Sequence, residues 1–164
     1  MKKSTILTVC TALLLPAIMF PIGASASPAP DLGSTADFKD VAGKEWILTE
    51  VRGSAKTVTM DRVKLIADNL GGVYTILFNE SQINGMGAPN RYFGPYTQSG
   101  GNALSIGNVA STMMLSFREP DGLSEREYFD YVSKVNRWNL RSGMLELYSQ
   151  DSSGREAVLV YKLN

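Results

Sequence analysis

The sequence has no histidine, a single cysteine, and equal numbers of acidic and basic residues. Cys10 is the only thiol, and 16 lysines and arginines stand against 16 aspartates and glutamates. Most zinc sites and most activated nucleophiles depend on histidine or cysteine, so the composition argues against both. A balanced charge without a basic cluster also argues against nucleic acid as a partner. We therefore predict no cofactor, no metal site and no nucleic-acid binding.

The N-terminus has the three parts of a secretory signal peptide. Lys2-Lys3 is a short basic start, residues 6–22 are apolar, and Ala24-Ser25-Ala26 is a small-residue cleavage site. We expect cleavage after Ala26 and export of the protein, either to the periplasm or out of the cell. The alternative, an uncleaved N-terminal anchor, is disfavoured by the cleavage site and by the polar chain that follows it. Cys10 lies inside the apolar region and is expected to be removed with it.

Removal of 26 of the 164 residues would leave 138, which is the size of one domain. Loss of Lys2 and Lys3 from the balance of 16 and 16 would leave a net charge of −2. That chain would have no cysteine, and therefore no disulfide in an oxidising compartment. It has no second apolar run long enough to span a membrane. We predict a flexible leader over residues 27–37 and one domain over 38–164.

Beyond the leader, short apolar segments alternate with turn signals, which is typical of an antiparallel β domain. In the first segment, Trp46, Leu48 and Glu50 would share one face of a strand, with Val51 on the other face. We predict a mainly antiparallel sheet of about eight strands, either barrel-like or strongly curved. The strand candidates are residues 45–52, 73–79, 82–86, 91–98, 103–106, 109–117, 137–141, 144–149 and 156–163.

One amphipathic helix is predicted over about residues 124–135. Ser124 and Glu127 form a capping box, and Leu123 and Tyr128 hold the hydrophobic-staple positions. From Tyr128, apolar residues recur at helical spacing down to Val135, so this helix must bury one face on the sheet or at one end of a barrel.

Residues 57–70 are ambiguous between strand and helix. The start, Thr57–Met60, favours a strand, whereas Val63, Ile66 and Leu70 fit one face of a helix. We predict a strand followed by a short helix or loop.

Six short motifs follow one another in a family's order. They are Trp46 with Leu48; Gly85 with Gly87-Ala88-Pro89-Asn90-Arg91-Tyr92; Gly94-Pro95-Tyr96; Leu104–Gly107 with Ala110-Ser111-Thr112-Met113-Met114; Glu125 with Tyr128 and Val132; and Arg137-Trp138 with Leu145-Glu146-Leu147. In this order they resemble the META domain family, the HslJ-like proteins of bacterial envelopes, from Trp46 to about Leu163. The resemblance implies an association with heat shock and with tolerance of an antibiotic, without an established mechanism.

The resemblance also assigns residues and shows two departures. The motif positions that we interpret as structural are Trp46, Gly85, Gly87, Ser111, Thr112, Met114, Glu125, Tyr128 and Trp138. Pro89 and Ser116 stand where the family has cysteines. If those two cysteines pair, this branch has lost the pair as a unit, and any function that depends on the thiols is in doubt.

Asn90, Arg91, Tyr92 and Tyr96 form a polar and aromatic cluster beside glycines and prolines. Such a cluster suits a peptide, a glycan or a small ligand, because tyrosine offers a rigid amphipathic contact. Alternatively, Asn90 completes a turn and the tyrosines pack into the barrel.

No catalytic residue is predicted elsewhere. Ser111-Thr112 has no histidine to act as a base, and helix capping accounts for Glu125 and Glu127. The methionines at positions 86, 113, 114 and 144 are interpreted as core residues.

Taken together, we expect an exported, non-enzymatic accessory or binding module of the cell envelope, with an unidentified small ligand or envelope protein as its partner. One alternative is a carrier of a lipid-like ligand, with Trp46, Tyr74, Phe78 and Trp138 lining a pocket in the barrel. Another is a protein-interaction module, such as an assembly chaperone or a protease inhibitor, which needs an exposed apolar patch or an open sheet edge. A hydrolase with an unrecognised site fits the sequence least.

Overall fold

A computed structural model describes residues 36–115 and 118–164, so the expected signal peptide and nearly all of the leader lie outside the described residues. The fold is mainly antiparallel β, as predicted. Its elements in chain order are the 3-10 helix η1 (Phe38–Asp40), β1 (Glu45–Gly53), β2 (Thr57–Thr59), α1 (Arg62–Ala67), β3 (Thr75–Phe78), β4 (Gln82–Met86), β5 (Arg91–Gln98), β6 (Leu104–Ile106), β7 (Ala110–Ser111), α2 (Glu125–Ser133), β8 (Arg137–Arg141), β9 (Met144–Gln150) and β10 (Glu156–Leu163).

Eight strands follow one another in a curved sheet that nearly closes into a barrel. Their order is β6-β5-β4-β3-β1-β10-β9-β8, while β2 pairs with β1 and β7 pairs with β5. At the seam between β6 and β8, Leu104 N donates to Asn136 O (3.2 Å) and Trp138 N donates to Asn102 O (2.9 Å). These bonds satisfy part of the two sheet ends that an open sheet would leave unpaired.

The first strand departs from the simple alternation that its sequence predicts. Its pairing with β10 shifts register between Leu48 and Glu50, as at a β-bulge. Beyond this shift Val51 is buried in the same core as Trp46 and Leu48, while Glu50 is only partly buried. The prediction that Glu50 shares the face of Trp46 was therefore wrong, because an irregular residue reverses the alternation beyond it.

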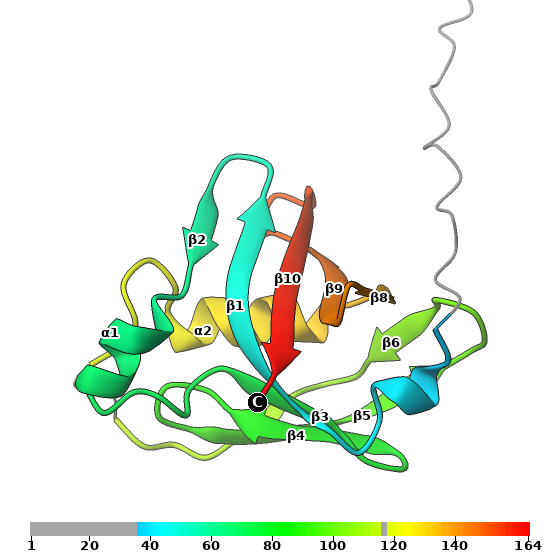
Figure 1. Cartoon of the computed structure of the whole chain (residues 1–164), viewed down its shortest axis with the longest axis horizontal. Helices are drawn as coiled ribbons and strands as arrows, with labels where there is room; N and C mark the ends of the chain where they lie inside the picture. The colour runs from blue at the N-terminus through cyan, green and yellow to red at the C-terminus, as the bar shows by residue number, and fades with distance from the viewer. Residues whose placement is uncertain (1–35, 116–117) are drawn as a thin grey trace, which may run out of the picture. The chain divides into compact units, whose positions relative to one another are not determined.

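Helix α2 buries the face that its sequence predicts. Ser124 caps it, accepting a hydrogen bond from Glu127 N (3.2 Å), and the staple residues Leu123 and Tyr128 are both buried. In Figure 1 the helix passes behind β1 and β10, and its buried residues join the core cluster of those strands. Among the described residues, no helix is long and apolar enough to cross a membrane.

Helix α1 presents a different face from the predicted one. Val63 and Ile66 are 81% and 67% exposed, and Leu65 is the buried residue. The reason is a contact with other elements: the guanidinium of Arg62 donates to the carbonyl oxygens of Leu48 (2.8 Å) and Val73 (2.9 Å). These bonds attach the first turn and fix which side of this six-residue helix points inward.

The segment after β7 also differs from its prediction. Of the strand predicted over 109–117, residues 109–115 are described, and among these it is regular only at Ala110–Ser111. Met113, Met114 and Leu115 are 98%, 62% and 83% exposed. The interpretation of the methionines as core residues was wrong, since Met86 and Met144 are only partly buried as well. On one side this segment pairs with β5, and no described strand covers its other side.

Closely packed side chains fill the interior of the barrel-like sheet. Trp46, Tyr74, Phe78 and Trp138 are fully or almost fully buried and belong to one core cluster. The ring of Phe38, from η1, meets the rings of Phe78 and Trp138 at centroid distances of 5.4 and 5.1 Å. Edge-to-face contacts of this kind are typical of a packed core.

Candidate functional site

Asn90 lies between β4 and β5 and holds the segment that follows β7. Its side chain is 5% exposed. The amide nitrogen donates to Met114 O (3.1 Å), and the amide oxygen accepts from Met114 N (2.6 Å) and from Thr112 Oγ1 (2.8 Å). The side chain of Asn90 therefore satisfies both backbone groups of Met114, as the backbone of a neighbouring β-strand would.

Glu125, the first residue of α2, joins the same turn to the helix. Its Oε1 accepts from the backbone nitrogens of Ala88 (2.5 Å) and Asn90 (2.7 Å), and its Oε2 accepts from Asn90 Nδ2 (2.6 Å). Hydrogen bonds to a carboxylate are stronger than neutral ones, so this anchor is firm. Gly87 is required beside it, because an added Cβ would overlap the carboxylate of Glu125 and the ring of Phe129.

Beneath this turn, three buried tyrosine hydroxyls form a chain around one carbonyl. Tyr92 and Tyr128 donate to Thr75 O (2.8 and 3.2 Å), their hydroxyls lie 3.0 Å apart, and Tyr161 donates to Tyr128 Oη (3.3 Å). Burial raises the pKa of all three hydroxyls well above the ordinary value of 10. They are therefore neutral structural donors at physiological pH. Gly85 packs against the Tyr92 ring, where a Cβ would come within 2.6 Å.

The polar and aromatic cluster predicted from the sequence does not form one surface. Asn90 and Tyr92 are buried, Arg91 is exposed, and Tyr96 is partly buried with its hydroxyl donating to Asn79 O (2.6 Å). The structure instead brings Asn90 together with Thr112, Met114 and Glu125, three residues of the motif set.

The other motif residues also make contacts within the fold. Trp46 donates from its indole nitrogen to Val41 O (3.0 Å) and Trp138 to Gly101 O (3.2 Å), while Ser111 lies opposite Tyr92 in the pairing of β7 with β5. Ser116 lies outside the described residues, so the idea of a lost cysteine pair stays a prediction.

Arg62 is a partly buried cation that the sequence gave no reason to single out. Besides its bonds to main-chain carbonyls, its guanidinium lies close enough to the buried tyrosines to interact with them electrostatically. Desolvation lowers the pKa of Arg62 to about 10, which still leaves it charged at neutral pH. Its contacts are those of an internal clamp that secures α1.

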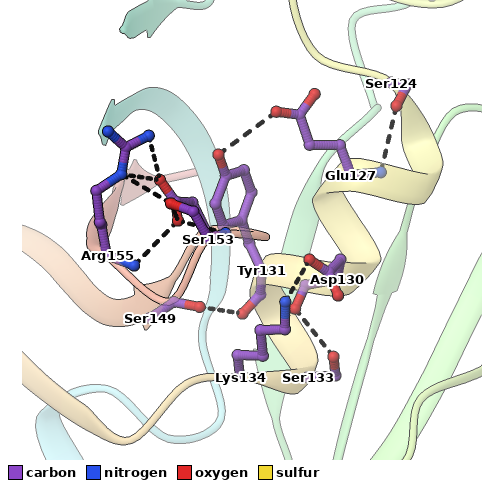
Figure 2. A network of polar contacts seen from close by, with 10 residues as sticks. Ser124, Glu127, Asp130, Tyr131, Ser133, Lys134, Ser149, Ser153 and Arg155 are labelled. Atoms are coloured by element: carbon purple, nitrogen blue, oxygen red, sulfur yellow. Dashed lines mark hydrogen bonds and ion pairs between the residues drawn. The ribbon is translucent and has the colours of Figure 1, made fainter. Parts of the chain in front are cut away.

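A groove of about 390 Å³ runs between the residues that lead into β7 and the exposed side of α2. It is lined by Asn108, Val109, Arg126, Phe129, Asp130 and Ser133. Asp130 is neutralised by Lys134 (2.7 Å), as Figure 2 shows. Over residues 36–115 and 118–164, Arg126 has no ion-pair partner, so the groove presents one unpaired positive charge.

The side of α2 that faces the β9–β10 turn, in contrast, has its polar groups paired with one another. Ser149 Oγ donates to Tyr131 O (2.6 Å), and the Tyr131 hydroxyl lies 3.4 Å from Glu127 Oε1 (Figure 2). In the turn, hydrogen bonds from Ser153 and from the backbone of Arg155 lower the pKa of Asp151 to about 2. A hollow of about 180 Å³ lies here, and many of the polar side chains that line it are hydrogen-bonded to other residues of the fold.

Elsewhere in the described residues, no group of three or more aspartates, glutamates, histidines or cysteines is placed to hold a metal ion. Ser111, Thr112 and Glu125, interpreted as structural from the sequence, take part in the fold: Ser111 stands opposite Tyr92 in the pairing of β7 with β5, and Thr112 and Glu125 are hydrogen-bonded to the turn around Asn90. The surface has other features, among them exposed Phe93 and a hollow of about 430 Å³ beside β3, β4 and β5. Three features lie together next to α2: the apolar Met113–Leu115 segment, the free side of β7 and the groove beside Arg126.

Comparison with known proteins places this arrangement in a family. A protein from Burkholderia xenovorans, solved by NMR, has a similar fold with a TM-score of 0.59 and 20% identity, covering 89% of this chain and 99% of that one. A DUF4847 family protein from Bacteroides vulgatus ATCC 8482 has a TM-score of 0.51 and 12% identity, over 77% of this chain and 96% of its own. No curated protein matches the sequence. The META domain model matches residues 39–161, and the chain therefore belongs to the META domain family.

Proposed function

We propose that this protein is an exported, non-enzymatic binding module that recognises another protein of the cell envelope through the segment after β7. The observation that carries the proposal is the exposure of Met113, Met114 and Leu115 next to a sheet edge. Three consecutive exposed apolar residues are unusual unless they meet a partner. The buried side chain of Asn90 binds the backbone of Met114 and so fixes these three residues in their exposed position.

Two further features support a binding role over catalysis or transport. Thr112 and Glu125 are engaged in holding the fold together, and neither has a neighbouring histidine that would make it a nucleophile or an acid–base pair. The aromatic residues suggested as the lining of a carrier pocket are packed in the core. Export rests on the N-terminal sequence, and the link to stress or antibiotic tolerance rests on the family resemblance.

Native mass spectrometry of the chain, produced with its N-terminal segment and purified from the envelope fraction of its own host, tests this function. We expect a stoichiometric protein partner that is lost from the variant Met113→Asp. The matched control is Val63→Asp, which places the same charge on another exposed apolar residue, in α1, and should retain the partner. A co-purified lipid would favour the carrier instead. A bare chain in every preparation, or a partner kept by Met113→Asp, would sink the proposal.

A further inference from the structure

The backbone of the β7 segment is paired on one side only. Thr112 N donates to Arg91 O (3.0 Å), and both backbone groups of Met114 bind Asn90. Since alternate residues of an edge strand point to opposite sides, the N–H and C=O groups of Ser111 and Met113 face away from β5. Within the described part of the chain no residue pairs with them. Among the residues described, the segment is therefore an edge on which two alternate residues, Ser111 and Met113, have unpaired backbone groups.

The groove described above lies beside this edge. Its apolar floor is formed by Val109 and Phe129, and its unpaired charge is Arg126. Arg126 is in the first turn of α2, where a cation is unfavourable beside the positive end of the helix dipole. The dipole therefore does not favour an arginine at this position, whereas a carboxylate bound in the groove would pair with it.

We propose that the β7 edge receives an extended segment of the partner protein as an added strand, with a carboxylate of that segment paired to Arg126. Main-chain hydrogen bonds to Ser111 and Met113 would supply affinity. Alternate apolar side chains would pack on Met113 and Leu115, while the carboxylate, on the opposite face of the added strand, would reach Arg126. This inference rests on the proposed function and adds the kind of partner segment: extended, alternately apolar and acidic.

Charge complementarity favours such a segment over a second copy of this chain. A symmetric pairing would place residues 108–115 of one copy, Asn-Val-Ala-Ser-Thr-Met-Met-Leu, against the same residues of the other. That stretch has no carboxylate, so the added strand itself would offer no partner to Arg126. A lipid surface is disfavoured because it offers no main-chain groups in register with Ser111 and Met113.

The test uses the full chain and three synthetic peptides. The probe is acetyl-Val-Thr-Val-Glu-Val-Thr-Val-amide; a second peptide replaces its glutamate by lysine, and a third is N-methylated at alternate residues so that it cannot pair on that edge. Fluorescence anisotropy measures affinity, and NMR shifts of the Ser111 and Met113 amides locate binding. We expect the probe to bind at these amides, the lysine peptide to bind roughly fivefold or more weakly, and the N-methylated peptide not to bind.

Two variants and one control complete the test. Arg126→Glu should reverse the preference between the glutamate and lysine peptides, and Met113→Pro should weaken the probe about tenfold by removing an outward N–H. Should Met113→Pro fail to fold, the N-methylated peptide still tests strand pairing, because it removes the bonds from peptide N–H groups to the carbonyl oxygens of Ser111 and Met113. Ile66→Ser, which removes an exposed apolar residue from α1, should bind as the unaltered chain does.

The outcomes separate this inference from the proposed function. Equal binding of all three peptides, no binding, self-association abolished by Met113→Pro, or binding only to anionic phosphatidylglycerol vesicles would each overturn the added-strand model. If the envelope partner is lost with Met113→Asp but kept by Arg126→Glu and Met113→Pro, the binding function stands and the added strand fails. Loss of the partner from all three variants would support both the binding function and the added strand.

Discussion

The variant Asn90→Ala tests whether the inward-facing part of the motif acts as a structural clamp. The substitution removes four hydrogen bonds: two with Met114, one with Thr112 and one with the carboxylate of Glu125. Asn90 is 5% exposed, so few of these bonds are replaced by water at the asparagine position itself. We expect a large loss of stability, concentrated at the junction of β5, β7 and α2.

The magnitude follows from the kinds of bond lost. The bond to Glu125 is charge-assisted and contributes about 1.5–3 kcal/mol, while the three neutral bonds contribute about 0.5–1.5 kcal/mol each. The groups of Thr112 and Met114 are on an exposed segment and can bind water in the variant, and Glu125 keeps its two backbone donors. The expected cost is therefore below the simple sum, at about 2–4 kcal/mol, or a fall in Tm of about 6–20 °C for a domain of this size.

Urea unfolding of Asn90→Ala and the unaltered chain measures this cost, with the slope of the transition checked for constancy. Limited proteolysis should also cut residues 112–115 faster in the variant, because their anchor is gone. The matched control is Asn108→Ala, at an exposed asparagine, which should stay within about 0.5 kcal/mol. A cost below about 0.5 kcal/mol for Asn90→Ala, with unchanged proteolysis, would refute the clamp and return Asn90 to the list of binding residues.

Three further outcomes follow from the contacts described. Gly85→Ala should lose about 1–3 kcal/mol in urea unfolding, because its Cβ overlaps Thr75 O and the Tyr92 ring, whereas Gly72→Ala, with no atom within 4 Å, should be neutral. The raised pKa values of Tyr92, Tyr128 and Tyr161 give stability that is present below pH 10 and lost as pH rises beyond it. In an absorbance titration the partly exposed tyrosines should ionise first, and the last tyrosinates should appear only together with unfolding; ionisation of all seven tyrosines in a folded chain would contradict this. The lowered pKa of Asp151 gives stability that is present above pH 3.8 and lost as pH falls towards about 2; Asp151→Asn should flatten that part of the pH–stability curve, and an unchanged curve would exclude this carboxylate as its source.

The order of the motifs predicted the family, and the structure explains what several motif residues do. Residues 35 positions apart in sequence, Asn90 and Glu125, are joined by two hydrogen bonds, and Thr112 reaches the same asparagine. The sequence left open whether Asn90 binds a ligand or completes a turn. The hydrogen-bond partners of Asn90 could not be deduced from the sequence, because Thr112, Met114 and Glu125 belong to other segments of the chain.

The sequence by itself determined the elements and the class of the fold. Alternating apolar residues, turn residues and the capped helix beginning at Ser124 depend on local physics, namely backbone propensity and the burial of one face. Most predicted strands therefore appear where expected. The tertiary structure decided which faces are covered. The register shift in β1 brought Val51 into the core, the Arg62 contacts turned Val63 and Ile66 outward, and the Asn90 clamp left Met113 exposed beside a free strand edge. Each of these depends on a partner distant in sequence, and the proposed binding surface arises from such long-range contacts.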